Sequence, residues 1–372
     1  MFSQHRRFFL RSIPASVILL FTVSACVKST LPAPTPVSEA TPTVSVSTAA
    51  PGETLTAPTL APTDATPTVT PITVIVAASQ AIDNAARQTA QEFGWIAGQA
   101  ADASIETLRP LAESGVSIIV AEGGGGDVRA LADEFPHIYF VAVNSVGENW
   151  PTNALALGGP GSRYDQLGFL AGMTAGYATE TKTVTAITDL SVTGLNYRNG
   201  FLHGVRYTCP RCQLQYIDVF DVEHSGAEAA QTAALYASIS SDVFFASAGR
   251  AGLEALQAAA QAGAWVIGAH IDIYFEKFGG AGTRSVAGAD QVLTSFYFDS
   301  GALVASALTH YQAGQPLSGA QPFSAANNAI AIAPYRTDAL NALDQQEIAA
   351  ALARLANGSL DTGIDPATGQ EK

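Results

Sequence analysis

The stretch DVFFASAGRAGLEALQAAAQAGAWVIGAH, residues 242–270, contains a complete strand–helix–strand unit. Its two ends, 242–249 and 264–270, include short apolar runs of the kind that form buried strands. The alanine-rich residues 252–262 between them are strong helix formers. Apolar strands that are joined by a helix are typical of a parallel sheet with helices on both faces.

The same alternation runs through the chain from residue 72 onward. Strands are predicted at 72–79, 116–124, 138–145, 182–190 and 214–222, and a helix of small residues at 166–179. This number of strands exceeds one small sheet, and 48% of the 372 residues are hydrophobic, which is enough for two cores. We therefore predict an α/β protein of two lobes, each a parallel sheet covered by helices.

We place one lobe at about 72–180 plus 285–340 and the other at about 181–284. A strand at 285–290 and a helix at 292–311 would return the chain toward the first lobe. Ligands bind beyond the carboxyl ends of strands in such sheets, so these ends should meet at a cleft between the lobes. The predicted strand ends carry Ser79, Gly123 to Gly126, Asn144, Asp189, Phe220, Gly249, His270 and Asp290.

The first 25 residues have the pattern of an export signal. A basic start is followed by an apolar run to Val23 that is short for a membrane span. Arg6 and Arg7 resemble a twin-arginine signal, although general secretion is left open. The sequence VSAC resembles a lipobox, in which Cys26 becomes the lipidated first residue of the mature protein. We expect a lipid anchor on the extracytoplasmic face of the cell membrane, the alternative being an ordinary signal with a chance cysteine.

Residues 26–71 form the predicted linker between this anchor and the lobes. From residue 31 onward it consists mainly of Pro, Thr, Ala, Ser and Val with no Lys or Arg, a composition that cannot bury a core. The whole chain has 32 acidic and 18 basic residues, a net charge of −14. This excess argues against a nucleic-acid partner, because phosphate binding needs clustered Lys and Arg.

Cys209 and Cys212 are the other two cysteines, in the sequence CPRC. A disulfide is the expected state of such a pair in an exported protein. A redox role is disfavoured because the motif lies in a polar connection, away from the start of a long helix. A zinc site would need two more ligands, which no neighbouring Cys or His cluster supplies.

Motifs for catalysis or cofactor binding are weak. The chain has no G-x-S-x-G elbow, H-E-x-x-H helix or Walker A lysine loop. The run Gly123 to Gly126 could hold a phosphate, but a strand-to-helix turn capped by Asp127 is favoured. The turn at Gly249 lacks the third glycine of a nicotinamide site, and His270 with Asp272 is a poor basis for a metal site. We predict no enzyme activity, cofactor or metal.

Several phrases together resemble the basic membrane lipoprotein family, which comprises lipid-anchored substrate-binding proteins of ABC importers that typically bind nucleosides. They are LADEFPHIYFVAVNS (131–145), LGFLAGMTAGYAT (167–179), RNGFLHGV (198–205), SDVFFASAGRAGLEALQAA (241–259), WVIGAHID (265–272) and DQVLTSFYF (290–298). The resemblance implies a periplasmic-binding-protein-like fold, a small-molecule ligand between two hinged lobes and an ABC permease as partner.

The resemblance also implies roles for individual residues. Amides near Gly249 would approach the ligand, and Phe220 falls where the family places an aromatic ring that stacks on the base. Asn144 and His270 occupy positions where the family has Asp, and Phe298 one where it has Lys. Ser79, with Gln80 and Asn84, would replace a polar segment after the first strand.

These replacements point to a planar ligand that is less polyhydroxylated than a nucleoside, because a neutral imidazole accepts only one hydrogen bond. Two other functions stay open for this scaffold: a lipoprotein sensor or paralogue without transport, and an exported enzyme.

Overall fold

The computed structural model describes residues 71–372, except 146, 148, 281 and 283. The predicted signal, the lipidation site at Cys26 and nearly all of the linker lie outside this range. In the part of the chain that is described, no helix has both the length and the hydropathy to cross a membrane.

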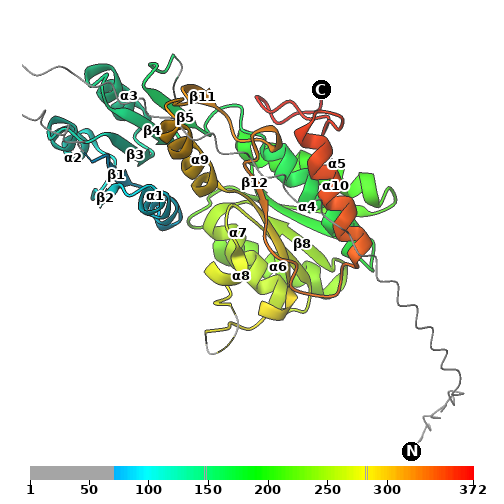
Figure 1. The fold of residues 1–372 in the computed structure, drawn as a ribbon. Helices are drawn as coiled ribbons and strands as arrows, with labels where there is room; N and C mark the ends of the chain where they lie inside the picture. The colour runs from blue at the N-terminus through cyan, green and yellow to red at the C-terminus, as the bar shows by residue number, and fades with distance from the viewer. Residues whose placement is uncertain (1–70, 146, 148, 281, 283) are drawn as a thin grey trace, which may run out of the picture. The chain divides into compact units, whose positions relative to one another are not determined.

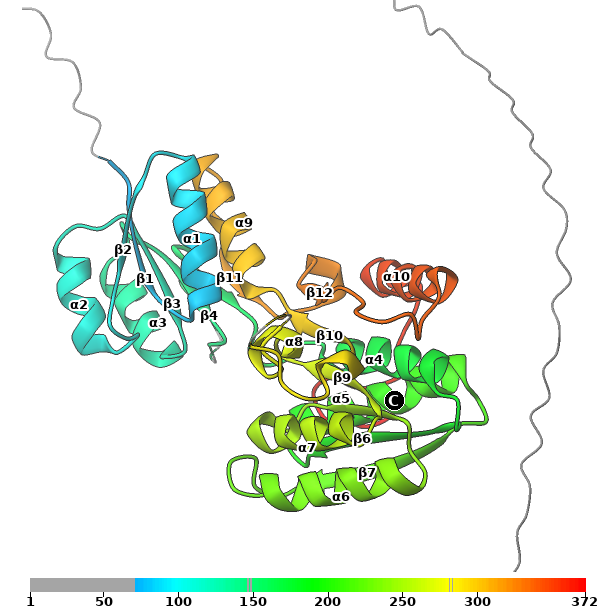
Figure 2. The ribbon, with the colours of Figure 1, turned by 90° about the horizontal axis from the view of Figure 1, so that it is seen from below.

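The first lobe contains a six-stranded sheet in which every neighbouring pair is parallel. Its order is β11 (Gly319–Gln321), β5 (Ala154–Leu157), β4 (Tyr139–Val143), β3 (Ile118–Glu122), β1 (Thr73–Ala77) and β2 (Ile96–Gln99). Helices α1 (Gln80–Glu92) and α9 (Ser300–Gln312) pack together on one face, and α2 (Ile105–Glu113) and α3 (Gly125–Glu134) on the other (Figure 2).

The second lobe contains another six-stranded sheet, shown with the first in Figure 1. Its order is β12 (Ile330–Ile332), β10 (Val292–Phe298), β9 (Trp265–Ala269), β8 (Val243–Ala246), β6 (Thr183–Asp189) and β7 (Gln213–Val219). Only β12 is antiparallel to its neighbour among these described strands. One face is covered by α4 (Tyr164–Ala178), α5 (Val192–Thr208) and α10 (Ala342–Ala356), the other by α6 (Gly226–Ile239), α7 (Gly249–Gln261) and α8 (Ile273–Glu276).

Helices α4 and α5 lie unusually close because glycines face each other between them. A Cβ atom at Gly200 would overlap the backbone oxygen of Asp165, and one at Gly204 would overlap that of Phe169. Gly168 and Gly172 play the same part from α4. The small residues of the 167–179 segment therefore allow the backbones of α4 and α5 to touch. A larger side chain at these glycines would not fit between the two helices.

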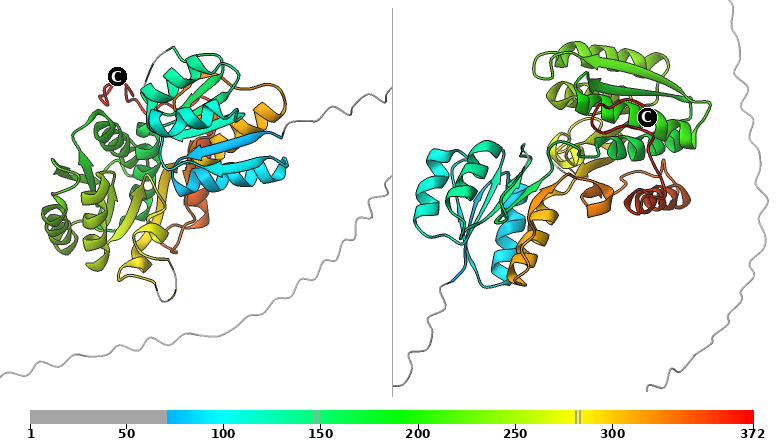
Figure 3. Two further views of the ribbon diagram at one scale, coloured as in Figure 1. Left: turned by 90° about the vertical axis from the view of Figure 1, so that its left-hand side faces the viewer. Right: turned by 90° about the horizontal axis from the view of Figure 1, so that it is seen from above.

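The chain crosses between the lobes three times. Figure 3 shows the ribbon from two further directions. The crossings lie between β5 and α4, between β10 and α9, and between β11 and β12. Phe298, the last residue of β10, packs against the apolar cores of both lobes. The hinge between the lobes therefore consists of three connecting segments and not of a single linker.

The predicted fold class is confirmed, but several elements belong to the other lobe. The helix expected at 166–179 in the first lobe is α4, which packs on α5 in the second lobe because of the glycine contact. Strands β10 and β12, within 285–340, also pair in the second sheet.

The expected strand at 285–290 is wrong, and the helix expected at 292–311 is present only from residue 300 onward, where it packs on α1 in the first lobe as expected. Residues 292–298 form the buried strand β10, and the helix begins only at 300, where the Asp299 carboxylate caps it by accepting from the amide of Ala302. The run VLTSFYF is rich in β-branched and aromatic residues, which favour a strand. Asp290 consequently precedes a strand instead of ending one.

Candidate functional site

A cavity of about 1140 Å³ opens where the strand ends of the two lobes face each other. Residues from both sheets line it, among them Ser79, Glu122, Asn144, Tyr164, Asn196, Tyr197, His270, Asp272, Glu276, Tyr297, Phe298, Asp299, Phe323 and Pro366. Its volume is sufficient for a small organic ligand. Four of the predicted ligand-binding residues, Ser79, Asn144, His270 and Phe298, lie in this one cleft.

In the first lobe, the Glu122 carboxylate fixes two of the predicted residues. Its Oε2 atom accepts from the backbone amide of Ser79 at 2.8 Å, and its Oε1 atom from the Nδ2 atom of Asn144 at 3.0 Å. Asn144 has a φ of +52°, a left-handed conformation that Asn tolerates better than most residues. Glu122 was not predicted as a site residue, because it reads as the end of an apolar strand.

In the second lobe, His270 directly follows β9 and has a left-handed conformation with a φ of +68°. Its Nε2 atom lies 3.1 Å from the carbonyl oxygen of Ser247, so this nitrogen carries the proton. Its Nδ1 atom lies 3.4 Å from the hydroxyl of Tyr197. The side chain is accessible from the cleft, yet desolvation by the surrounding protein lowers the pKa of His270.

A row of four aromatic rings lies at the cleft, of which Tyr164 and Phe298 are half-buried and Tyr197 and Phe323 are buried. Phe323 contacts Phe298 at 5.0 Å between ring centroids, and Phe298 contacts Tyr164 at 5.2 Å. The row continues from Tyr164 to Tyr197 at 5.4 Å. Of these rings, only Phe298 was predicted from the sequence. Tyr197 lies inside a helix and looks like a core residue, and the lobe crossing before Tyr164 is not visible in the sequence.

Carboxylates are the dominant charged groups of the cleft. Among the described lining residues, Glu122, Asp272, Glu276 and Asp299 are acidic, and none is Lys or Arg. Asp272 is paired with Arg336 at 2.7 Å and caps the short helix α8. Desolvation, together with the charges of Asp299 and Asp272, raises the pKa of Tyr297.

The carboxylate of Asp272 is therefore committed to an ion pair. In the ranges that the structure describes, no group of three or more His, Cys, Asp or Glu residues could hold a metal ion. The pair His270 and Asp272 does not form a metal centre with a third ligand of this kind.

The C-terminal segment contributes a wall that the sequence did not predict. Pro366 and Ala367 line the cleft, and the Nδ2 atom of Asn196 donates to the carbonyl of Pro366 at 3.0 Å. Asn199 donates to the carbonyl of Gly369 at 2.6 Å, and Thr362 donates to the buried Asp165 carboxylate. The segment is therefore tied along α4 and α5, about 170 residues away in the sequence.

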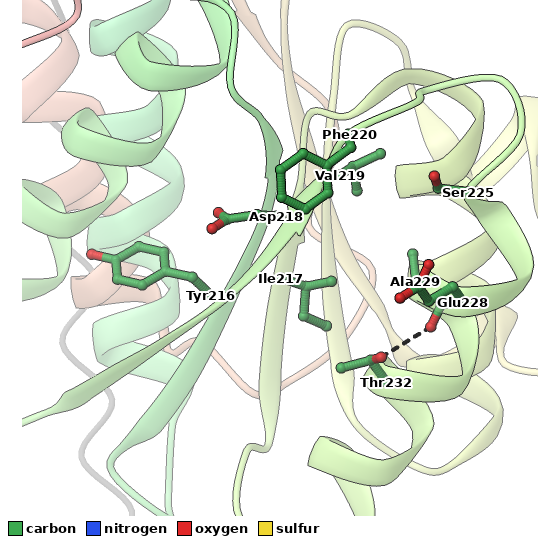
Figure 4. A pocket seen from close by; sticks show the side chains of 9 residues that line it. All are labelled: Tyr216, Ile217, Asp218, Val219, Phe220, Ser225, Glu228, Ala229 and Thr232. Carbon is green, nitrogen blue, oxygen red and sulfur yellow. Dashed lines mark hydrogen bonds between the residues drawn. The ribbon is translucent and has the colours of Figure 1, made fainter.

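Two of the predicted ligand-binding residues do not line the cleft. Phe220 is 84% exposed and borders a separate pocket of about 280 Å³ between β7 and α6 (Figure 4). Gly249 begins α7 with a φ of +52°, next to Val222. The left-handed turn explains the glycine, whereas the roles expected for Phe220 and Gly249 toward a ligand stay predictions.

The other motifs resolve into local structure. Gly124, with a φ of +61°, precedes the first residue of α3, where a Cβ atom would lie 2.7 Å from the Ala103 oxygen. Asp127 lies in the first turn but does not cap the helix through its side chain, so that part of the prediction is wrong. Cys209 and Cys212 lie between α5 and β7 at disulfide distance, with Cα atoms 5.4 Å apart.

Two α/β lobes, joined by three crossings and lined at their strand ends by aromatic and polar side chains, define the class of periplasmic-binding-protein-like solute-binding proteins. Within this class, the chain belongs to the family of PnrA-like ABC transporter substrate-binding proteins, whose model matches residues 76–353. Among curated protein sequences none matches this chain.

Solved structures share the fold at low sequence identity. A transcriptional activator of the comK gene from Bacillus halodurans is 16% identical, with a TM-score of 0.63 over 78% of this chain and 99% of the other. An ABC transporter solute-binding protein from Conexibacter woesei is 20% identical, with a TM-score of 0.62 over 78% and 98%. One from Aeropyrum pernix is 12% identical, with a TM-score of 0.57 over 78% and 93%.

Proposed function

We propose that this protein is the lipid-anchored solute receptor of an ABC importer, binding a small, planar, nucleoside-like ligand in the interlobe cleft. The observation that carries this proposal is the pair of half-buried rings Phe298 and Tyr164, which line one cavity and pack against the buried rings of Phe323 and Tyr197. Stacking of a flat ligand on an aromatic ring contributes about 1–3 kcal/mol.

The anchoring part of the proposal rests on the sequence. Cys26 follows a signal-like apolar run, and a Pro- and Thr-rich stretch separates it from the lobes. Substrate-binding proteins of ABC importers work outside the cytoplasm, so an anchor at Cys26 would hold the receptor near its permease.

The polar groups of the cleft argue for a ligand other than an ordinary purine nucleoside. Asn144 and His270 stand where the resembling family has carboxylates, and both nitrogens of His270 already face protein partners. A ribose would therefore find no carboxylate at these two positions to accept two of its hydroxyls at once. Adenosine, guanosine and inosine should bind poorly for this reason.

The ligand is best identified from the full chain isolated from the membranes of its native host. Mass spectrometry of the small molecules released on denaturation should find one solute in near-stoichiometric amount, and calorimetry should show that the emptied protein rebinds it. Tight binding of a purine nucleoside would overturn the account of the polar groups while leaving the receptor proposal standing.

Deletion of the gene separates transport from sensing. Loss of uptake of the identified solute supports an importer receptor. Unchanged uptake with a changed transcriptional response to the same solute would instead support the sensor function.

A further inference from the structure

The side chains that line the cleft carry a net negative charge. Glu122, Glu276 and Asp299 line it without a Lys or Arg partner among the described residues, and only Asp272 is paired, with Arg336. A concave site with walls of low dielectric constant concentrates the electric field of these carboxylates. An anionic ligand would be repelled, and a cation would be attracted.

A buried hydrogen-bond acceptor, the Oδ1 atom of Asn196, also favours a ligand with a donor group. Asn196 lines the cleft and is only 1% exposed, and its Nδ2 atom donates to the carbonyl oxygens of Val192 and Pro366. With the amide nitrogen fixed by two acceptors, its Oδ1 atom is buried without a hydrogen-bond partner among the described residues. An unpaired buried acceptor is costly, so the site favours a ligand that supplies an N–H or O–H donor.

The aromatic row adds a third, independent preference. The half-buried rings of Tyr164 and Phe298 border the same cavity as the carboxylates. Aromatic faces are electronegative and attract organic cations, more strongly where water is excluded. Carboxylates beside aromatic rings are thus suited to a protonated amine attached to a flat or apolar body.

We infer that the ligand of the cleft is an organic cation, a protonated amine on a planar body, and not a neutral or anionic solute. This inference rests on the proposed receptor function and narrows its ligand class. Glu276 at the end of α8 and Asp299 directly after β10 supply the charge, the rings of Tyr164 and Phe298 support the planar body, and Asn196 accepts a hydrogen bond from the ligand.

Three probes that share an indole ring and differ in charge test the inference. Tryptamine is a cation at neutral pH, tryptophol is neutral, and indole-3-acetate is an anion. Calorimetry on the emptied full chain should rank their affinities in that order, and tryptamine should bind severalfold more weakly at about 0.5 M than at about 0.02 M salt, because screening reduces charge attraction. Equal or tighter binding of either other probe overturns the inference.

A charge-removing double variant tests the residues. Asp299→Asn with Glu276→Gln keeps the cap of α9, because Asn also caps helices well, while it removes two charges. The tryptamine affinity should fall about fivefold to twentyfold, and the tryptophol affinity should change less than about twofold. The matched control, Glu113→Gln with Asp133→Asn, removes two exposed charges outside the cleft and should leave both unchanged.

The outcomes distinguish the two proposals. If a neutral or anionic solute copurifies and binds in the cleft, the receptor function stands and the charge assignment falls. If no probe binds and no solute copurifies, the receptor proposal itself fails, and the inference with it. An equal loss of tryptamine affinity in the control variant would also overturn the assignment to Glu276 and Asp299.

Discussion

The Nε2 atom of His270 lies 3.1 Å from the carbonyl oxygen of Ser247, while its Nδ1 atom faces the hydroxyl of Tyr197 at 3.4 Å. A neutral imidazole with its proton on Nε2 satisfies both contacts, with Tyr197 as the second donor. His270 therefore ties the ends of β8 and β9 to α5.

Replacement of His270 by Asn should change how stability depends on pH. Desolvation by the surrounding protein lowers the pKa of His270 although its side chain is open to the cleft, so at a pH near and below its unfolded value of about 6.5 the unfolded chain binds more protons than the native one. The free energy of unfolding is therefore highest above that pH, and it decreases as the pH falls. The slope from this group should stay well below the roughly 1.4 kcal/mol per pH unit of one full proton, because solvent in the open cleft screens the exposed side chain.

His270→Asn keeps a residue that tolerates the left-handed backbone, and it should remove this slope in denaturant titrations between pH 5 and 8, about the range where histidine titrates. The exposed His137→Asn is the control and should retain the slope. A wild-type pH dependence in His270→Asn would contradict the assignment.

Phe220→Ala gives a clean test of the stacking role expected from the sequence. Because Phe220 is 84% exposed, the change should alter the free energy of unfolding by no more than about 0.5 kcal/mol. If its ring stacks on the ligand, affinity for the identified solute should fall about tenfold to a hundredfold. Unchanged affinity by calorimetry would restrict binding to the residues that line the cleft.

Asn196→Ala should loosen the C-terminal wall of the cleft. The carbonyl of Pro366 loses its donor, which should cost about 1–2 kcal/mol of stability. Hydrogen exchange should quicken at the amides of Gly369 and Lys372, which bond within the segment. The control Gln312→Ala, at an exposed position on α9, should leave this exchange unchanged. Equal exchange rates in both variants would show that Asn196 does not hold the C-terminal wall in place.

Cys209 and Cys212 should form a disulfide in the exported protein. Thiol titration of the unfolded, unreduced Cys26→Ser chain should find no free thiol, because only these two cysteines remain. Reduction should destabilise the fold by less than the roughly 3 kcal/mol expected for a 15-residue loop, since the closed loop is shorter. Two titratable thiols before reduction would disprove the pairing.

Cys26→Ser should release the protein from the membrane. The substitution removes the thiol that the predicted lipid would modify, so the variant should appear in the soluble fraction outside the cytoplasm. Fractionation followed by salt and carbonate washes measures this. A variant that stays with the membrane through both washes would refute the lipid anchor, whereas Cys209→Ser should remain anchored like the parent.

Part of the cleft was predictable because its residues end strands. Ser79, Asn144, His270 and Phe298 each follow or end an apolar run, and parallel strands direct such ends to one edge of a sheet. Phe220 obeys the same rule but follows β7 at the outer edge of its sheet. The sequence shows which residues end a strand, but it does not show the order of the strands in the sheet. Phe220 was therefore predicted to line the cleft, although it lies outside it.

The sequence by itself determined the alternation of strands and helices, the α/β class and the turns that need glycine at Gly124 and Gly249. These features depend on residues near one another in the chain, whose propensities and backbone preferences act locally. Only the tertiary structure decided that α4 and β10 belong to the second lobe, and that Pro366 meets Asn196 in the wall of the cleft. Those contacts join segments far apart in sequence, where close packing and the pairing of buried polar groups select one partner among many of similar composition.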